Sequence, residues 1–313
     1  MTVTYQAICQ AHERIKPFIH RTPILTSRII NELVGAELYF KCENFQKGGA
    51  FKARGAFNAV HSLPETQLSK GVVTHSSGNH AAALALACAS RQAKATVVMP
   101  SNSPTPKKLA VAGYGATIVE CEPTLAAREA AADKILADTL GTFLHPYDND
   151  QIIAGQGTAA KEMIEDGPAF DIVMCPVGGG GLLAGTAISV KELLPNAKVI
   201  AAEPLGADDA KRSFDAGHII PQVQANTIAD GLLTSVGERN FVIMQDKVDE
   251  ILTATEQNIV RAMRLIWQHM KIVIEPSSAV PLACLLEHQR DLSGKRIGII
   301  LTGGNVDIDK LPW

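Results

Sequence analysis

The stretch from Asn44 to Ala56, NFQKGGAFKARGA, holds three cations: Lys47, Lys52 and Arg54. A lysine acts as a nucleophile or a base only when part of its amine is neutral, which requires apolar or cationic surroundings that lower its pKa. Phe51 and two alanines give Lys52 apolar neighbours, and Arg54 supplies a nearby positive charge. An isolated lysine is most often a surface charge, so the residues alone do not rank Lys52 above Lys47.

Four consecutive glycines, Gly178, Gly179, Gly180 and Gly181, stand between an apolar run and a helical pattern. Glycine permits a positive φ and a close approach of the backbone, and the first turn of a helix offers unpaired N–H groups with a favourable dipole. A tight turn needs fewer glycines. The loop therefore predicts an anion site, with a phosphate group as its occupant.

Two further polar loops follow strand-like segments. HSSGNH covers His75 to His80, and TGGN begins at Thr302. Helix capping would require one of Ser76, Ser77 and Asn79, whereas six consecutive small or polar residues are typical of a nest that binds a carboxylate or a phosphate. We expect the HSSGNH loop to bind such a group.

Three carboxylates, Glu203, Asp208 and Asp209, follow the strand-like VIAAE. Carboxylates clustered after a strand can hold a hard cation together with backbone oxygens. A solvated loop with a helix cap at Asp208 is the interpretation that the residues alone favour, and a cation site is the alternative.

The glycine loop also permits a different function. Gly179, Gly181 and Ala184 fit the GxGxxA form of a dinucleotide fingerprint, and Glu203 stands about twenty residues later, as that fingerprint requires. This hypothesis predicts an oxidoreductase, but it explains neither Lys52 nor the two other loops.

The elements that must position these residues alternate between short β-type runs and longer helical patterns, which favours parallel sheets covered by helices. Ligands of open α/β sheets collect at the carboxyl ends of strands, so we expect the three loops to share one site. Helices are expected after SSGNH, from Lys107, over Arg128–Leu140 and after the glycines. Strands are expected at Gly71–Thr74, Ala95–Met99, Ala116–Glu120, Asp171–Val177, Val199–Glu203 and Ile297–Thr302.

Length and composition favour either two lobes or one large α/β domain. The chain has 313 residues, of which 46% are hydrophobic and 19% charged. A net charge of −3 without a long charge run excludes a nucleic-acid surface and a basic membrane face. The six cysteines form no CxxC pair, and we find neither a signal-like start nor an apolar run of transmembrane length. We therefore expect a cytoplasmic protein.

Four motifs occur in this order: FQKGGAFKARGA, THSSGNH, PVGGGGLLAG and LTGGNVD. Together they resemble the fold-type-II pyridoxal-phosphate enzymes, and most of all the group of serine racemase and the serine/threonine dehydratases. The resemblance covers essentially the whole chain. It implies two α/β domains with mostly parallel twisted sheets and the cofactor in the cleft between them. The large domain would comprise residues 1–70 and 147–313, and the small domain residues 71–146.

The resemblance implies roles around pyridoxal 5′-phosphate. Lys52 would carry the cofactor as a Schiff base and serve as the base for the α-proton, with Phe51 beside the ring. Asn79 would bond the cofactor 3′-oxygen, and Gly178–Gly181 would hold the phosphate. Thr302 would face the pyridine nitrogen. Arg54 would be structural or would tune the charge near Lys52.

The resemblance also implies substrate contacts. Ser76, Ser77, Asn79 and His80 would hold the substrate carboxylate, and Ser77 matches the serine that acts on the opposite face in serine racemase. Arg128 matches an arginine that contacts the substrate of the closed racemase.

The stretch AAEPLGADD resembles the racemase's divalent-cation site. Glu203, the Ala207 carbonyl and Asp209 would hold Mg²⁺, Mn²⁺ or Ca²⁺, which reverses the preference for a solvated loop.

The chain departs from the animal racemases at Ala81 and Ala82, which replace a glycine and a glutamine. That glutamine belongs to a nucleotide-effector site in those racemases, so activation by ATP is in doubt.

The implied reaction is β-elimination of a β-hydroxy amino acid to a 2-oxo acid and ammonia, with racemase activity as a possible addition. Serine, threonine and 3-hydroxyaspartate are the candidate substrates, and Arg128 or His80 could bind the second carboxylate of hydroxyaspartate. One alternative is an enzyme that is primarily a serine or aspartate racemase. A dinucleotide-binding oxidoreductase and a non-catalytic cofactor carrier are more remote. A homodimer is the assembly that the resemblance implies.

Overall fold

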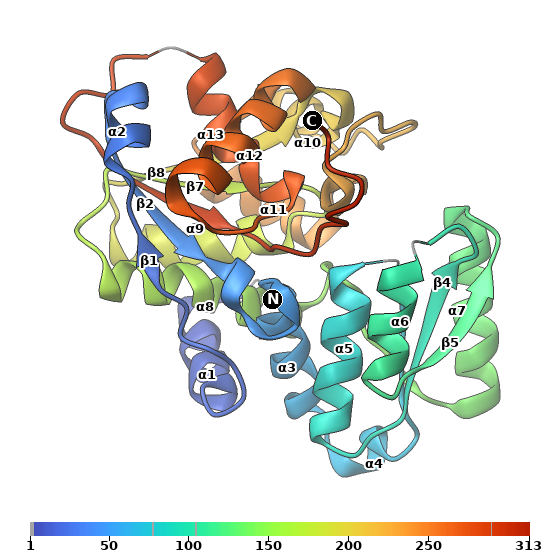
Figure 1. The fold of residues 1–313 in the computed structure, drawn as a ribbon. Coiled ribbons are helices and arrows are strands. Elements are labelled where there is room, and N and C mark those ends of the chain that lie inside the picture. The colour runs from blue at the N-terminus through green and yellow to red at the C-terminus, as the bar shows by residue number, and fades with distance from the viewer. Residues whose placement is uncertain (1–2, 77, 104, 289) are drawn as a thin grey trace.

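The computed structural model describes residues 3–313 except Ser77, Pro104 and Gln289, and its strands form two sheets covered by helices (Figure 1). The strands are β1 (Ile24–Leu25), β2 (Glu37–Cys42), β3 (Val72–His75), β4 (Ala95–Pro100), β5 (Thr117–Cys121), β6 (Thr142–Phe143), β7 (Ile172–Pro176), β8 (Lys198–Pro204), β9 (Glu250–Ala254) and β10 (Arg296–Leu301). The helices are α1 (Tyr5–Ile15), α2 (Arg28–Val34), α3 (Lys52–Ser62), α4 (Glu65–Leu68), α5 (Asn79–Ser90), α6 (Thr105–Gly113), α7 (Leu125–Thr139), α8 (Asp150–Asp166), α9 (Gly181–Leu193), α10 (Asp209–Ala216), α11 (Glu238–Lys247), α12 (Glu256–Met270) and α13 (Pro276–Glu287). Four short 3-10 turns are η1 (Glu43–Phe45), η2 (Lys47–Gly49), η3 (Leu205–Ala207) and η4 (Asp230–Leu232).

The larger sheet has six strands in the order β1-β2-β10-β7-β8-β9, and every pair is parallel except β1 with β2. Successive side chains of a strand point to opposite faces, so each central strand contributes to two cores. In β7, Met174 packs into the core on the α12 and α13 side, whereas Val173 packs into the core that α8 and α9 cover. Both faces are therefore buried, which explains the nearly continuous apolar runs of these strands.

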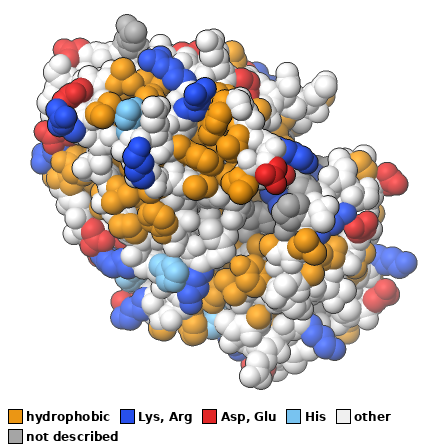
Figure 2. Space-filling model, viewed as in Figure 1, with side chains coloured by type: hydrophobic (Ala, Val, Ile, Leu, Met, Phe, Trp, Pro, Cys, Tyr) orange, Lys and Arg blue, Asp and Glu red, His pale blue; other side chains and the backbone are white. Residues whose placement is uncertain are grey.

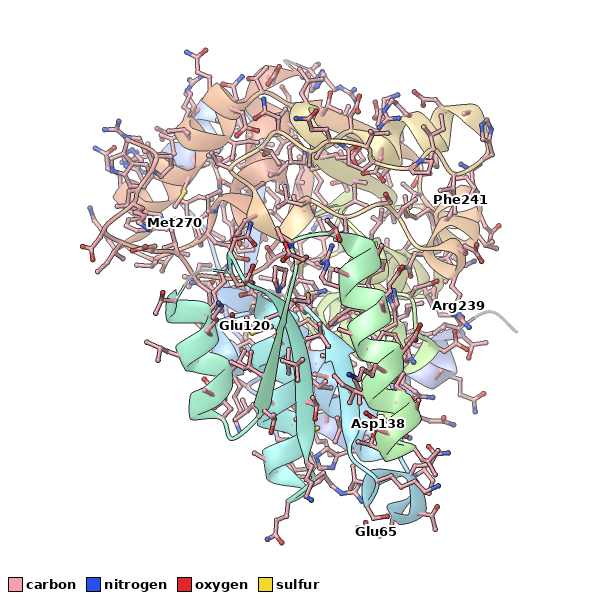
Figure 3. All side chains as sticks on the ribbon, turned by 90° about the vertical axis from the view of Figure 1, so that its right-hand side faces the viewer. Glu65, Glu120, Asp138, Arg239, Phe241 and Met270 are labelled. Carbon is pink, nitrogen blue, oxygen red and sulfur yellow. The ribbon has the colours of Figure 1, made fainter. Side chains whose placement is uncertain are left out.

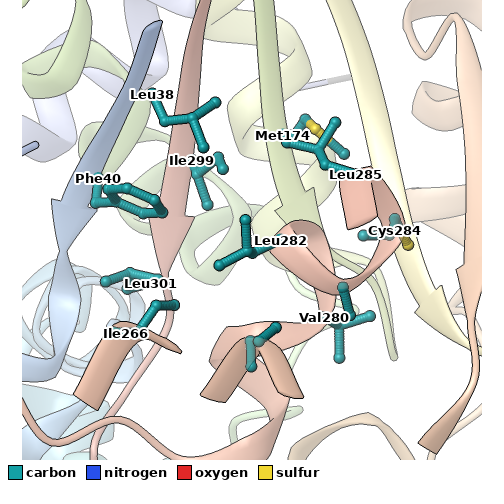
Figure 4. Packing of buried hydrophobic residues seen from close by; sticks show 14 of the residues in the cluster. Leu38, Phe40, Met174, Ile266, Val280, Leu282, Cys284, Leu285, Ile299 and Leu301 are labelled. Carbon is teal, nitrogen blue, oxygen red and sulfur yellow. The ribbon is translucent and has the colours of Figure 1, made fainter. Parts of the chain in front are cut away.

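The core on the α13 side is built from alternate residues of neighbouring strands. Figure 4 shows Leu38 and Phe40 of β2 beside Ile299 and Leu301 of β10, with side chains of α13 packed over them. This packing fixes β10, and with it the loop that begins at Thr302.

The smaller sheet has four parallel strands in the order β5-β4-β3-β6. Ala81 and Ala82 of α5 pack with Val97 and Met99 of β4 on one face. Helix α7 covers the other face, where Ala132 packs against buried residues of β3 and β4.

The carboxyl ends of the small sheet's strands face the larger body. In Figure 3, Glu120 near the end of β5 lies close to that body, whereas Glu65 of α4 lies at the far end of the molecule. The loop that follows β3 is therefore directed toward the loops that follow β7 and β10.

The strands expected from the sequence are all present, with ends that differ by at most one residue. Four strands were not expected: β1, β2, β6 and β9. The expected helix over Arg128–Leu140 begins earlier, at Leu125, because the Thr124 side chain accepts a hydrogen bond from the Ala127 N–H and caps it.

All strands of the smaller sheet lie within residues 71–146, but the proposed domain boundaries stay a prediction. On the face seen in Figure 2, acidic and basic side chains are interspersed, with hydrophobic side chains between them. In the part of the chain that the structure describes, no helix has the length and hydropathy needed to cross a membrane.

Candidate active site

A cavity of about 320 Å³ lies where the two sheets' carboxyl ends meet. It collects residues from all three predicted loops and from α3. The predicted residues that line it are Phe51, Lys52, Ser76, Asn79, His80, Arg128, Gly178, Gly179, Gly180, Gly181 and Thr302. The expectation that the loops share one site is therefore confirmed as a matter of geometry. Ser77 lies outside the described residues.

Lys52 is the first residue of α3 and is partly buried. Its amine donates a hydrogen bond to the Pro146 carbonyl oxygen at 3.1 Å and lies 5.2 Å from the centre of the Phe51 ring. Burial lowers the pKa of Lys52 to about 8, against an opposing effect of the Glu275 carboxylate. A sizeable share of the amine is thus neutral near pH 8, which a nucleophile or a base requires.

Arg54 does not supply the positive charge expected beside Lys52. Its guanidinium is fully buried and binds Glu43 (Nε to Oε2, 2.7 Å) and Glu162 (Nη2 to Oε2, 2.7 Å). Lys41 donates to the same Glu162 oxygen at 2.8 Å. Two cations and two carboxylates form a buried cluster that joins α3 to β2 and α8, and burial rather than Arg54 lowers the pKa of Lys52.

The glycine loop is shaped by the tyrosine that follows Pro146. A Cβ on Gly179 would lie 2.3 Å from the ring of Tyr147, and Gly180 has a φ of +90°. Asn240 Nδ2 donates to the Gly179 carbonyl oxygen at 2.7 Å and secures the loop from α11. The N–H groups of Gly178–Gly180 make no hydrogen bond to another described residue, so they are free to bind an anion at the start of α9.

Asn79 begins α5 and uses both ends of its amide. Its Nδ2 donates to the Glu275 carboxylate oxygens at 2.9 and 3.1 Å, and its Oδ1 accepts from Asn305 Nδ2 at 2.9 Å. The sequence interpretation missed Glu275, because nothing in the EPSS stretch at the start of α13 linked it to the polar loops.

Thr302 ends the apolar run of β10 with a buried hydroxyl. Its Oγ1 lies 3.0 Å from Ser278 Oγ, which also donates to the Gly303 carbonyl oxygen at 2.7 Å. The Thr302 carbonyl oxygen accepts from the Phe51 N–H at 2.9 Å, so the loop is tied to the start of α3.

Two predicted substrate contacts differ in charge. His80 is 2% exposed, both its ring nitrogens lack hydrogen-bond partners among the described residues, and burial lowers its pKa well below the usual value. A neutral imidazole cannot provide a positive charge for a second carboxylate. Arg128 remains the candidate for binding a second carboxylate. Its Nε is buried without a hydrogen-bond partner in the described part of the chain.

Glu203 in β8 and Asp209 at the start of α10 are buried, contrary to the interpretation as a solvated loop, whereas Asp208 is partly exposed. Glu203 accepts from the N–H groups of Ala210 (2.9 Å) and Lys211 (2.8 Å), so Glu203 rather than the expected Asp208 caps α10. Asp209 accepts from the Val236 N–H at 3.0 Å through Oδ2, while its buried Oδ1 has no partner among the described residues. Burial raises the pKa of Glu203 to about 8 and that of Asp209 to about 6.

Ala207, which lies between Glu203 and Asp209 in the sequence, is fully buried. In the described part of the chain, no cluster of three or more His, Cys, Asp or Glu side chains could hold a metal ion. The predicted cation site has only two such side chains, and its third ligand is a main-chain carbonyl oxygen. It is therefore not a cluster of this kind.

Comparisons with known proteins cover almost the whole chain. The profile of the family described as "Pyridoxal-phosphate dependent enzyme" matches residues 15–303. The chain is 53% identical over 310 residues to a "beta-hydroxyaspartate dehydratase" of Paracoccus denitrificans, covering 99% of this chain and 98% of that one. It is 43% identical to an "L-threo-3-hydroxyaspartate ammonia-lyase" of Saccharomyces cerevisiae, covering 98% and 94%. The crystal structure of serine racemase from Dictyostelium discoideum, 52% identical, superposes with a TM-score of 0.94 and covers 98% of this chain and 100% of that one.

Proposed function

Because the chain belongs to the family of pyridoxal-phosphate dependent enzymes, we propose that it catalyses β-elimination of 3-hydroxyaspartate to a 2-oxo acid and ammonia. The observation that carries this choice of substrate is Arg128, a cation in the same cavity as Lys52 with no ion-pair partner among the described residues. Serine and threonine have no second carboxylate to occupy it.

The residues of the cavity fit the cofactor. Lys52 has the lowered pKa that a covalent bond to an aldehyde requires, and the N–H groups of Gly178–Gly180 at the start of α9 suit a phosphate. Asn79 and Thr302 would hold the ring, and Phe51 would flank it. When bound, pyridoxal phosphate supplies an electron sink for negative charge at the substrate Cα.

Lys52 is the group that removes the α-proton in this proposal. Its amine is buried beside Phe51, is held by the Pro146 carbonyl, and is in part neutral near pH 8. Loss of the β-hydroxyl then yields a product that hydrolyses to the 2-oxo acid and ammonia. Ser77, which lies outside the described residues, is our candidate for a proton carrier on the opposite face and hence for racemase activity.

The substrate's two carboxylates would bind to different elements. The start of α5, with Ser76, Asn79 and His80, offers N–H groups and a positive dipole end to the α-carboxylate. Arg128 near the start of α7 would bind the β-carboxylate. A charge-assisted hydrogen bond to that group would select hydroxyaspartate over serine.

We also propose a divalent cation, such as Mg²⁺, at Glu203, the Ala207 carbonyl and Asp209. Two observations support this site: burial raises the pKa values of both carboxyls, and Asp209 Oδ1 has no partner among the described residues. A bound cation would stabilise both groups in their charged, carboxylate form. A homodimer is a further proposal that rests on the sequence resemblance, and a cytoplasmic location is a further proposal that rests on the sequence itself.

A substrate panel tests the proposed activity. The holoenzyme is assayed with the four isomers of 3-hydroxyaspartate, both serine enantiomers and threonine, following 2-oxo acid, ammonia and substrate enantiomer. We expect the highest kcat/KM with one hydroxyaspartate isomer and equal amounts of 2-oxo acid and ammonia. Faster racemisation of serine than elimination of any hydroxyaspartate would favour the racemase alternative.

A further inference from the structure

Glu275 is a buried carboxyl in the same cavity as Lys52, and it is 3% exposed. It is the residue before α13, yet its side chain makes no capping hydrogen bond to that helix. Its main-chain N–H donates to the Gly303 carbonyl oxygen at 3.0 Å, which fixes it against the loop after β10. Helix capping therefore does not explain why a carboxylate is buried at this position.

The hydrogen-bond partner of this carboxylate is an amide. Asn79 Nδ2 lies 2.9 Å from Glu275 Oε1 and 3.1 Å from Oε2. Because both acceptors belong to one carboxylate on one side of the nitrogen, the second N–H of the amide remains available. Asn305 Nδ2 donates to Asn79 Oδ1 at 2.9 Å, so the amide cannot flip without losing bonds at both ends.

Charges face Glu275 from several elements. Lys52 belongs to α3, Lys107 to α6 and Asp230 to η4, and Lys107 also pairs with Asp230. Burial and the charge of Asp230 raise the pKa of Glu275 to about 7. Glu275 in turn opposes the lowering of the Lys52 pKa. The two groups therefore titrate in neighbouring pH ranges and influence each other.

We propose that Glu275 is a positioning residue of the active site: its carboxylate orients the Asn79 amide toward the cofactor from within the cavity that also holds the Lys52 amine. This inference rests on the proposed roles of Lys52 and Asn79. It adds a buried carboxylate outside the motif residues, which acts through the Asn79 amide.

Two substitutions separate the two effects. Glu275→Gln keeps the volume and an oxygen that accepts from Asn79, but it removes the charge. We expect the kcat–pH profile of the holoenzyme to move by about one unit to lower pH, because Lys52 loses a nearby opposite charge. Glu275→Ala removes the clamp on Asn79, and we expect the dissociation constant of pyridoxal phosphate, measured by fluorescence, to rise about tenfold.

Glu287 supplies the matched control at the other end of α13. It also accepts a hydrogen bond from an asparagine amide, Asn258 Nδ2 at 3.0 Å, but it does not line the cavity. Glu287→Gln and Glu287→Ala should leave the pH profile and the cofactor affinity unchanged. If Glu275→Ala fails to fold, Asn305→Ala removes the other anchor of the same amide and should weaken cofactor binding in the same way.

The proposal is overturned if the profile of Glu275→Gln coincides with that of Glu287→Gln, or if cofactor affinity survives the loss of the amide's anchors. Borohydride reduction of the wild-type holoenzyme separates this failure from failure of the proposed function. Cofactor trapped on Lys52 with no effect at Glu275 would reject the role of Glu275 alone, whereas absence of trapping would reject the role of Lys52.

Discussion

The amine of Lys52 donates a hydrogen bond to the main-chain carbonyl oxygen of Pro146 at 3.1 Å. A carbonyl oxygen accepts from a neutral amine as well as from an ammonium group, so this bond holds the nitrogen in place without fixing its charge. The next residue, Tyr147, packs its ring against Gly179 of the glycine loop. One short segment thus links the reactive lysine to the predicted phosphate site.

Activity should depend on the protonation of Lys52. Since burial lowers the pKa of this lysine to about 8 and the base must be neutral, kcat should rise as the pH increases through about 8 and then level off. A pH series of kcat at saturating substrate measures this. Lys52→Ala should lower kcat by about 10³-fold. Lys47→Ala is the control, and equal losses in both variants would contradict the assignment.

Arg128 should discriminate between substrates. Arg128→Met removes the cation that we assign to the β-carboxylate, so kcat/KM for 3-hydroxyaspartate should fall about 10- to 100-fold through loss of a charge-assisted hydrogen bond. The value for serine should change by less than about threefold, because serine has no second carboxylate. Lys134→Met, on the exposed side of the same helix, is the control. Equal losses for both substrates would mean that Arg128 does not recognise this carboxylate.

The buried carboxyls of Glu203 and Asp209 predict a dependence of stability on pH and metal. Their folded pKa values, about 8 for Glu203 and about 6 for Asp209, lie above the usual values, so the native state binds more protons than the unfolded state in this range. Stability of the metal-free protein should therefore fall as the pH rises from about 5 to 8.

Mg²⁺ should raise the Tm more at pH 8 than at pH 6, and EDTA should reverse the effect. Asp209→Asn should abolish this response. Asp208→Asn, which changes a carboxylate paired with Arg212, should retain it. A wild-type Tm that is insensitive to both Mg²⁺ and EDTA would contradict the cation site.

The buried cluster around Arg54 predicts a large and localised loss of stability. Arg54→Met leaves Glu43 and Glu162 with too little positive charge, which should lower the free energy of unfolding by about 3–5 kcal/mol. Arg28→Met breaks only an exposed pair with Glu32 and should cost less than about 1 kcal/mol. Urea unfolding followed by circular dichroism compares the two, and similar values would show that the cluster contributes little.

Motif spacing predicted the shared site but not the contacts that organise it. The loops at HSSGNH, GGGG and TGGN follow parallel strands, so their meeting follows from the sheet geometry alone. Glu275 and Tyr147 were missed, because their importance arises from contacts with Asn79 and Gly179, which lie far from them in the sequence. The two-residue strands β1 and β6 were missed because their pairing with neighbouring strands, rather than a local pattern, defines them.

The expectation that Arg54 tunes the charge near Lys52 was wrong for a related reason, whereas the alternative, a structural role, agrees with its buried ion pairs. Its position two residues after Lys52 suggested a shared environment, but residues two apart on a helix do not face each other. Arg54 is directed toward α8 and its buried carboxylates, whereas Lys52 faces the cavity.

Reduction of the wild-type holoenzyme with borohydride, followed by peptide mass spectrometry, tests the central claim most directly. It distinguishes the two lysines that the sequence alone left equal. We predict the mass of reduced pyridoxal phosphate on the peptide that contains Lys52, with fragment ions that assign it to Lys52 and leave Lys47 unmodified. Modification of Lys47, or a protein that carries no cofactor on Lys52, would contradict the account.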